Sequence, residues 1–225
     1  MANLDLEEQE QLDQLKHFWR QYGNLITWTL ILVLTAYAGW NGWQWWQRNQ
    51  ALKASGMYAE LDRAAQSGDA ARAGKVFDDL KGSYGGTTFA EQGGLLTAKV
   101  QAEKGQADAA RASLAWVAAN AKEGEYRAIA RLRLAALQID QGKPDDALKT
   151  LEAEFPPSFR GLAADRRGDV LQAQGKPAEA VKAYQSAYDA LDAASDYRRL
   201  VDAKLTALGA APPAAAASAA SGVAP

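Results

Sequence analysis

An uncharged, apolar run near the N-terminus most constrains how this chain of 225 residues can fold. The 27 residues between Arg20 and Arg48 carry no formal charge, and residues 25–46 are mostly apolar. About 20 helical residues are enough to cross the roughly 30 Å of hydrocarbon in a bilayer. Residues 25–38 are interrupted only by three threonines, so they lack the polar stripe of a buried core helix. The run therefore predicts a transmembrane helix over residues 23–47.

A cleaved signal peptide is the alternative to an anchor. Ala36-Tyr37-Ala38 has the small-x-small pattern of a cleavage site. However, residues 1–24 are long and acidic, whereas a signal peptide begins with a short basic region. We interpret the run as an uncleaved single-pass anchor that follows a short segment, residues 1–22.

Basic residues flank the anchor on both sides. Lys16 and Arg20 precede it, and Arg48, Lys53 and Arg63 follow it. Lys and Arg favour the cytoplasmic side of a membrane, but long domains cross largely regardless of charge. The charge pattern therefore leaves the orientation open, and it permits a cytoplasmic N-terminus with a translocated C-terminal body.

Aromatic residues gather at both ends of the anchor, where they could form a packed core, a ligand-binding box or an interfacial belt. Trp40, Trp43 and Trp46 recur every three residues and Trp45 lies beside the last. They are therefore spread around a helix, as suits the boundary between hydrocarbon and water. The predicted membrane-interface residues are Trp19, Tyr22, Trp28, Trp40, Trp43, Trp45 and Trp46.

Two glycines lie among these tryptophans. Gly39 and Gly42 are three residues apart, so they share one side of the predicted helix. Missing side chains let a second transmembrane helix approach closely. We predict that Gly39 and Gly42 pack against a partner helix.

Composition excludes several functional classes. Alanine is abundant and valine, isoleucine and threonine are sparse outside the anchor, which favours helices over sheets. The net charge is −2 and the pI about 5.6, so no basic field favours nucleic acid. The chain has no cysteine, which excludes disulfides, thiolate zinc sites and a cysteine nucleophile. We expect an all-α protein that binds no nucleic acid.

Four segments after the anchor repeat one pattern. Their glycines are 37, 37 and 33 residues apart, and each is followed by alanine five residues later and by a larger apolar residue nine residues later. The four sets are Gly68, Ala73 and Phe77; Gly105, Ala110 and Leu114; Gly142, Ala147 and Leu151; Gly175, Ala180 and Tyr184. The spacing predicts helical hairpins in which glycine takes a positive φ in the turn and alanine lies where two helices cross.

A period of about 34 residues with these features is typical of tetratricopeptide repeats. The alternative is a set of alanine-rich hairpins with a coincidental period, because the first repeat departs from the pattern and the spacings are uneven. We predict an N-terminal transmembrane helix followed by a tetratricopeptide-like α-α hairpin domain over residues 48–208. Residues 196–209 look like a terminal helix that covers the last repeat. Residues 209–225 lack charge and periodicity, and we expect a disordered Ala/Pro-rich tail.

No constellation predicts catalysis, a metal site or a cofactor. His17 is the only histidine, and a lone interfacial histidine is more often solvated than catalytic. The acidic pairs Asp78-Asp79 and Asp145-Asp146 are adjacent on helices, so their carboxylates diverge instead of facing across a cleft. We predict that the protein is not an enzyme.

We interpret the glycine-rich residues 82–94 as a long connection between repeats. They lack the Lys-Ser/Thr of a phosphate-binding loop. We expect Thr87 or Thr88 to cap the next helix and Glu91 to reach back to its start as a capping box.

Stacked helical pairs ordinarily bind polypeptide on a concave surface lined by the first helix of each pair. The positions ten residues before the turn glycines are Tyr58, Leu95, Leu132 and Asp165. We predict that these four residues line a partner-binding surface. The two leucines would fit a buried core equally well.

The whole layout resembles a known family. An acidic N-terminal segment ends in FWRQYGN at residues 18–24, the anchor ends at Gly39-Trp40, and repeats follow at residues 131–151 and 163–184. These features are similar to the YfgM family, ancillary subunits of the bacterial SecYEG translocon, over roughly residues 10–208. The resemblance implies an inner-membrane protein with a cytoplasmic N-terminus and a periplasmic body. It also implies association with SecYEG and with a PpiD-type periplasmic chaperone, and it implies no catalytic residue.

The function predicted from this resemblance is to tether chaperones or emerging secretory polypeptides beside the Sec channel, with membrane lipid around the anchor. The extra tryptophans and the Ala/Pro-rich tail depart from the family pattern. An alternative from another class is a cell-envelope scaffold or stress-signalling regulator that sequesters a regulatory protein with the same domain. A hydrolase with an unrecognised site is a third hypothesis.

Overall fold

A computed structural model describes residues 6–210, with side chains from residue 11 onward. Every regular element in this range is a helix, which confirms the all-α prediction. The helices are α1 (Leu6–Gln66), α2 (Ala70–Tyr84), α3 (Thr88–Glu103), α4 (Ala107–Asn120), α5 (Gly124–Asp140), α6 (Pro144–Leu151), the 3-10 helix η1 (Pro157–Phe159), α7 (Arg160–Ala173), α8 (Pro177–Ala190) and α9 (Asp196–Ala207). Beyond residue 210, the predicted tail lies outside the residues that the structure describes.

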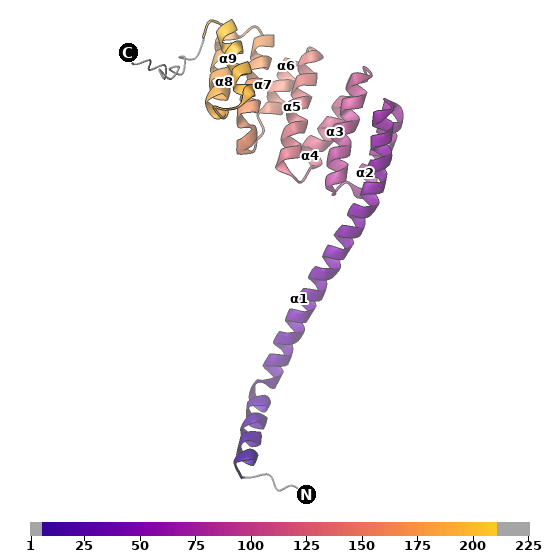
Figure 1. The fold of residues 1–225 in the computed structure, drawn as a ribbon, viewed down its shortest axis with the longest axis vertical. Coiled ribbons are helices and arrows are strands. Elements are labelled where there is room, and N and C mark those ends of the chain that lie inside the picture. Colours follow the sequence, from indigo (N-terminus) through magenta and orange to yellow (C-terminus); the bar gives the residue numbers. More distant parts are fainter. Residues whose placement is uncertain (1–5, 211–225) are drawn as a thin grey trace, which may run out of the picture. The chain divides into compact units, whose positions relative to one another are not determined.

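The chain divides into two units between Leu52 and Lys53. In the first unit, α1 is helical throughout the predicted anchor, as Figure 1 shows. This helix is long and apolar enough to cross a membrane, and only 6% of its apolar window is buried. The hydroxyls of Thr27, Thr29 and Thr35 donate to the carbonyl oxygens four residues earlier, at 2.7, 2.8 and 2.7 Å. The hydroxyls of these three threonines are thus satisfied within the helix.

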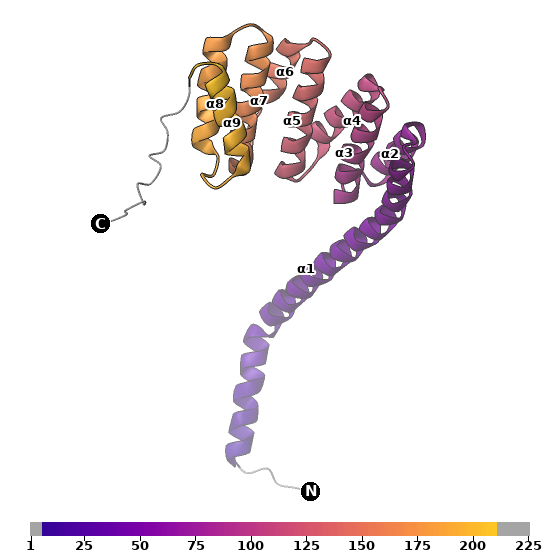
Figure 2. The same cartoon turned by 45° about the horizontal axis from the view of Figure 1, so that its top comes forward.

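In the second unit the helices follow one another as hairpins. Figures 1 and 2 show α3 beside α4, α5 beside α6 and α7 beside α8, with α9 against α8. The connecting glycines have φ between 68° and 73°, so the predicted left-handed turns are confirmed. Their positions are Gly68, Gly105, Gly142 and Gly175. A residue with a side chain would be strained at each of them.

A fifth turn of the same kind follows α9. Gly209 has a φ of 73°, and the N–H of Ala210 donates to the carbonyl of Leu205 at 2.9 Å. The turn after α3 has the same bond, from Gln106 to Gln101 at 2.8 Å. The terminal helix therefore ends like the first helix of a further pair, which the sequence comparison of four segments had missed.

The repeated small residues lie where the helices cross, as predicted. The four alanines that follow the turn glycines by five residues, Ala73, Ala110, Ala147 and Ala180, are all fully buried. The larger residues four positions later are at most 7% exposed. In the last pair Gly168 lies directly against the ring of Tyr184, so even a methyl group there would overlap the ring. Pro144 and Pro177 occupy the first turns of α6 and α8, as expected for a residue without an N–H.

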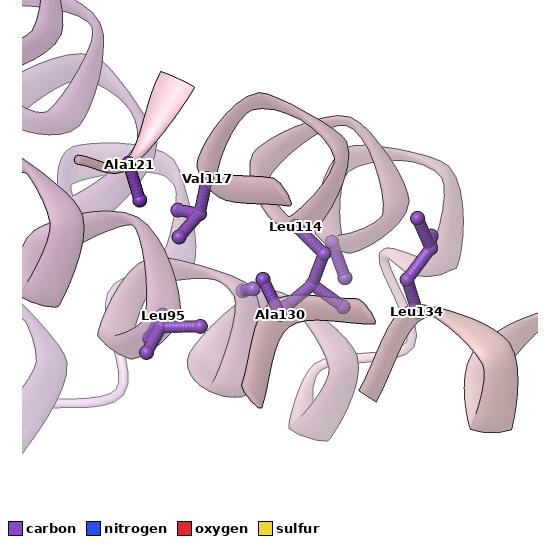
Figure 3. Close-up of a cluster of buried hydrophobic side chains, with 8 residues drawn as sticks. Leu95, Leu114, Val117, Ala121, Ala130 and Leu134 are labelled. Carbon is purple, nitrogen blue, oxygen red and sulfur yellow. The ribbon is translucent and has the colours of Figure 1, made fainter. Parts of the chain in front are cut away.

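Each hairpin contributes to a local cluster of apolar side chains, and the cluster of α3, α4 and α5 is drawn in Figure 3. Leu95 of α3, Leu114 and Val117 of α4, and Ala130 and Leu134 of α5 meet there. Such clusters between neighbouring elements are how repeat proteins build a core.

One capping prediction is confirmed and one is wrong. The side chain of Thr87 accepts from the N–H of Ala90 and caps α3. Glu91 does not reach back to form a capping box. Its carboxylate is buried and accepts from the backbone N–H of Lys122 at 2.8 Å, because the loop between α4 and α5 packs over the start of α3. Glu91 therefore ties α3 to the loop that leads from α4 into the next hairpin.

Candidate functional site

One of the open hollows in the repeat unit is a groove between α3 and α5. We call it the α3–α5 groove; it encloses about 370 Å³. Its floor is apolar and consists of Ala98, Ala102, Leu114, Ala136 and Leu137. Four charged side chains surround it, namely Lys99, Glu103, Arg133 and Asp140.

The groove exists because the sequence places short side chains between two helices. Ala102 and Ala136 cannot fill the space between α3 and α5, and Leu114 of α4 closes it from below. At the rim, Arg133 donates to the carbonyl of Leu95 across the two helices at 3.5 Å, which is a long contact. These features leave an apolar strip open to solvent.

The charges of the rim balance. Lys99 and Glu103 lie 3.9 Å apart and both are mostly exposed, so this pair adds little stability. With two cations and two anions around an apolar floor, the groove has no preference for one sign of charge. It suits an extended polypeptide with small apolar side chains better than a charged small molecule.

The four predicted surface residues do not line this groove. Leu95 is 7% exposed and belongs to the core of Figure 3, and Leu132 packs against a separate core around Phe155. The ring of Tyr58 packs on Phe89 with centroids 5.7 Å apart, and burial, followed by the charge of a nearby carboxylate, raises its pKa. Asp165 is fully buried. Leu95 and Asp165 therefore lie on no exposed surface, because the positions ten residues before Gly105 and Gly175 face inward on α3 and α7.

The residues that do line the groove lie about one turn further along each helix. Lys99 and Ala136 stand six residues before their turn glycines, Gly105 and Gly142. Counting six rather than ten positions back from each glycine would have found them.

Asp165 belongs to a buried ionic network instead. Its carboxylate accepts from the hydroxyl of Tyr197 at 2.7 Å and from the ammonium group of Lys204 at 2.7 and 2.9 Å. Asp169, one turn later on α7, accepts from Lys204 at 2.7 Å and from the hydroxyl of Tyr184 at 2.9 Å. Two carboxylates of α7 thus hold one lysine of α9.

The electrostatics of this network keep its hydroxyl groups protonated. Burial first, and then the hydrogen bond to Asp169, raise the pKa of Tyr184. Burial and the hydrogen bond to Asp165 raise the pKa of Tyr197 in the same way. Both tyrosines are therefore fixed as donors. Because the groups satisfy one another, the network fastens α9 to α7 and offers no free group for chemistry.

Other candidate groups are solvated. His17 is exposed on α1, and Asp78, Asp79, Asp145 and Asp146 are exposed on their helices. Within the described residues, no group of three or more His, Asp or Glu side chains lies close enough to hold a metal ion.

The aromatic residues of α1 face outward. The seven predicted interface residues are between 43% and 68% exposed, so they do not form a core within this part of the chain. A Cβ atom added at Gly39 or at Gly42 would meet nothing within 4 Å. Their roles at a membrane interface and in helix packing stay predictions.

Comparisons with known proteins agree with this architecture. The profile of the tetratricopeptide repeat-like domain family matches residues 16–210. The chain is 31% identical to the ancillary SecYEG translocon subunit of Neisseria gonorrhoeae over 204 residues, which are 90% of this chain and 98% of that protein. It is 30% identical to the Haemophilus influenzae protein of the same name, over 81% of this chain and 89% of that protein. The Escherichia coli protein of that name is 28% identical over 80% of this chain and 86% of its own length.

The family match covers the apolar helix as well as the hairpins, and the relatives are matched over nearly their whole length. The resemblance seen in the sequence is thereby confirmed. This chain belongs to the YfgM family of ancillary SecYEG translocon subunits, built on a tetratricopeptide repeat-like domain.

Proposed function

We propose that this protein is a membrane-anchored, non-catalytic subunit of the SecYEG translocon whose repeat unit binds polypeptide in the α3–α5 groove. The observation that carries the proposal is the match to the gonococcal ancillary SecYEG translocon subunit over 90% of this chain and 98% of that protein. The apolar part of α1 supplies an anchor of sufficient length.

The proposed mechanism is tethering. The N-terminus lies in the cytoplasm, α1 crosses the bacterial inner membrane, and the repeat unit lies in the periplasm beside the channel exit. A binding module held near its ligand acts at an effective concentration on the order of mM. A weak groove is therefore sufficient to capture an emerging secretory polypeptide or to hold a PpiD-type chaperone.

The groove's chemistry fits such ligands. Its floor of alanine and leucine accepts small apolar side chains, and the charged rim can pair with polar groups of either sign. Secretory polypeptides vary in sequence, so a neutral groove with a shallow floor suits them better than a deep, specific pocket.

The orientation is tested with reporters fused after residue 208. We expect alkaline phosphatase, which is active only in the periplasm, to be active in this fusion. We expect a green fluorescent protein fusion, which fluoresces after folding in the cytoplasm, to be dark. The opposite pattern would place the body in the cytoplasm and would contradict the proposal.

Binding is tested by photo-crosslinking in the full-length protein. A photoreactive residue at Ala102 or Ala136 lies in the groove, and the same residue at the exposed Ala115 of α4 is the matched control. We expect Ala102 and Ala136 to capture translocating polypeptide, chaperone or SecYEG subunits more strongly than Ala115. Equal capture at all three positions would argue against the groove. Capture of a regulatory protein without Sec subunits would favour the sequestration alternative.

A further inference from the structure

A hollow on one face of α1 combines indole, amide and guanidinium groups at the end of the apolar run. It encloses about 390 Å³ and is lined by Trp40, Trp43, Gln44, Gln47 and Arg48. These residues follow Trp40 by three, four, seven and eight positions, so they lie along one side of the helix. We call this site the Trp40–Arg48 hollow. Apolar rings near the run and polar groups beyond it give it the chemistry of a lipid headgroup site.

Arg48 holds an uncompensated positive charge in this hollow. Its guanidinium donates to the side-chain oxygen of Gln44 at 3.2 Å, which is a neutral acceptor. The sequence contains no Asp or Glu from residue 14 to residue 59, so no carboxylate of that stretch can pair with it. The lysine before the run differs, because Lys16 pairs with Asp13 at 3.2 Å. A guanidinium has five N–H donors, and most of those of Arg48 are left for an anion.

The remaining groups of the hollow complement a phosphate. Gln44 uses its oxygen to accept from Arg48, which leaves its NH₂ group as a donor, and Gln47 adds a second amide. The ring of Trp43 packs against that of Trp46 with centroids 5.4 Å apart, which restrains its position. Indole rings favour the boundary between hydrocarbon and water, where phosphates of lipids lie.

We propose that the Trp40–Arg48 hollow binds the headgroup phosphate of an anionic phospholipid. The planar fork of arginine matches phosphate oxygens in pairs, while the indoles lie against the glycerol and the first acyl carbons. A zwitterionic lipid also carries a cationic group. Residues 14–59 contain no carboxylate that could pair with that group. The proposal rests on the membrane anchoring of α1 proposed above, and it adds selectivity for one class of lipid.

The test uses the full-length protein in bilayers that contain spin-labelled lipids. The fraction of motionally restricted lipid reports that α1 is embedded, and the ratio of labelled phosphatidylglycerol to labelled phosphatidylcholine in that fraction reports headgroup selectivity. We expect the wild-type protein to select phosphatidylglycerol. Arg48→Gln should lower this selectivity about five-fold, because a basic residue contributes about 1 kcal/mol at an anionic surface. Lys16→Gln should lower it much less, since Lys16 already has a carboxylate partner.

A second pair of variants tests the aromatic wall. Trp43→Leu removes a ring that lines the hollow, whereas Trp45→Leu removes an exposed ring that does not. Only the first should reduce selectivity. Restricted lipid without headgroup selectivity, or equal losses in Arg48→Gln and Lys16→Gln, would overturn the lipid site and leave the anchor intact. The absence of any restricted lipid would overturn both the site and the anchoring proposal.

Discussion

Replacing Lys204 by methionine should release α9 from the repeat unit. The ammonium group of Lys204 lies 2.7 Å from an oxygen of Asp165 and 2.7 Å from one of Asp169. Methionine keeps most of the volume of the side chain but leaves both carboxylates of α7 without this cation. The side chain of Asp165 is completely buried, so it cannot regain its hydration unless α9 moves.

The size of the effect follows from this burial. Removing one partner of a buried ion pair costs about 3–5 kcal/mol. Because a quarter of the Lys204 side chain is exposed and Arg166 still pairs with Asp169 at 3.1 Å, we expect the lower end, about 3 kcal/mol. For a chain of this size each kcal/mol lowers the melting temperature by roughly 2–4 °C, so a decrease of about 6–12 °C is expected.

The assay is thermal unfolding of the full-length protein, followed by far-ultraviolet circular dichroism, with hydrogen exchange at 25 °C. Repeat proteins open from their ends, so exchange should accelerate in α9 and at the buried Val201 and Leu205 before it does in α3 to α5. Lys182→Met, which changes an exposed lysine of α8, is the matched control.

A double variant tests whether the unpaired buried charge, and not lost packing, causes the destabilisation. Asp165→Asn removes the buried charge that Lys204→Met leaves behind, so the double variant should be more stable than the sum of the two single losses predicts. A melting temperature for Lys204→Met within error of the Lys182→Met control, or strictly additive losses in the double variant, would refute the view that this network fastens α9.

Three further predictions concern Tyr197, Gly168 and Gly39. The raised pKa of Tyr197 means that the folded state favours the neutral phenol. The stability that this phenol contributes is therefore complete below pH 10 and is lost as the pH rises further. Tyr197→Phe should flatten the alkaline decline of the melting temperature. Gly168→Ala forces a methyl into a neighbouring ring and should cost about 1–3 kcal/mol in chemical denaturation, whereas Gly82→Ala, where a Cβ meets nothing within 4 Å, should stabilise its helix by up to about 1 kcal/mol. Gly39→Leu should weaken co-purification with SecYEG more than Ala38→Leu does, and equal retention would mean that the glycine face packs against no subunit.

The hairpins could be predicted from the sequence because their determinants are local. A positive φ demands glycine at Gly68, Gly105, Gly142 and Gly175, and close helix crossings demand small residues at a fixed distance from them. These requirements recur in each repeat, so spacing alone reveals them. Gly209 shares the glycine and the alanine five residues later, but it was missed because Ser218, not a larger apolar residue, stands nine residues after it.

The binding face was harder to predict, because it depends on how helices are rotated against one another. Positions ten and six residues before a turn glycine differ by four residues, which is only about 40° around a helix. Sequence periodicity does not resolve so small a rotation. Leu95 therefore proved to be core, and Lys99, one turn later, lies at the groove.

Asp165 was misplaced for a different reason. An aspartate is rarely buried unless it is paired, and its partners Tyr197 and Lys204 lie 32 and 39 residues further along the chain. No local sequence pattern predicts such a pairing. Contacts that join separate hairpins had to come from the structure.

The groove and the ionic network occupy different parts of the repeat unit, and this separates binding from stability. The α3–α5 groove is built from α3, α4 and α5, whereas the network joins α7 to α8 and α9. In a stack of hairpins each pair contacts only its neighbours, so a defect at the end spreads weakly towards the middle. Lys204→Met should therefore leave crosslinking from Ala102 almost unchanged at a temperature where the rest of the unit is folded. If release of α9 abolished crosslinking there as well, α9 would itself belong to the binding surface, and the groove alone could not account for partner capture.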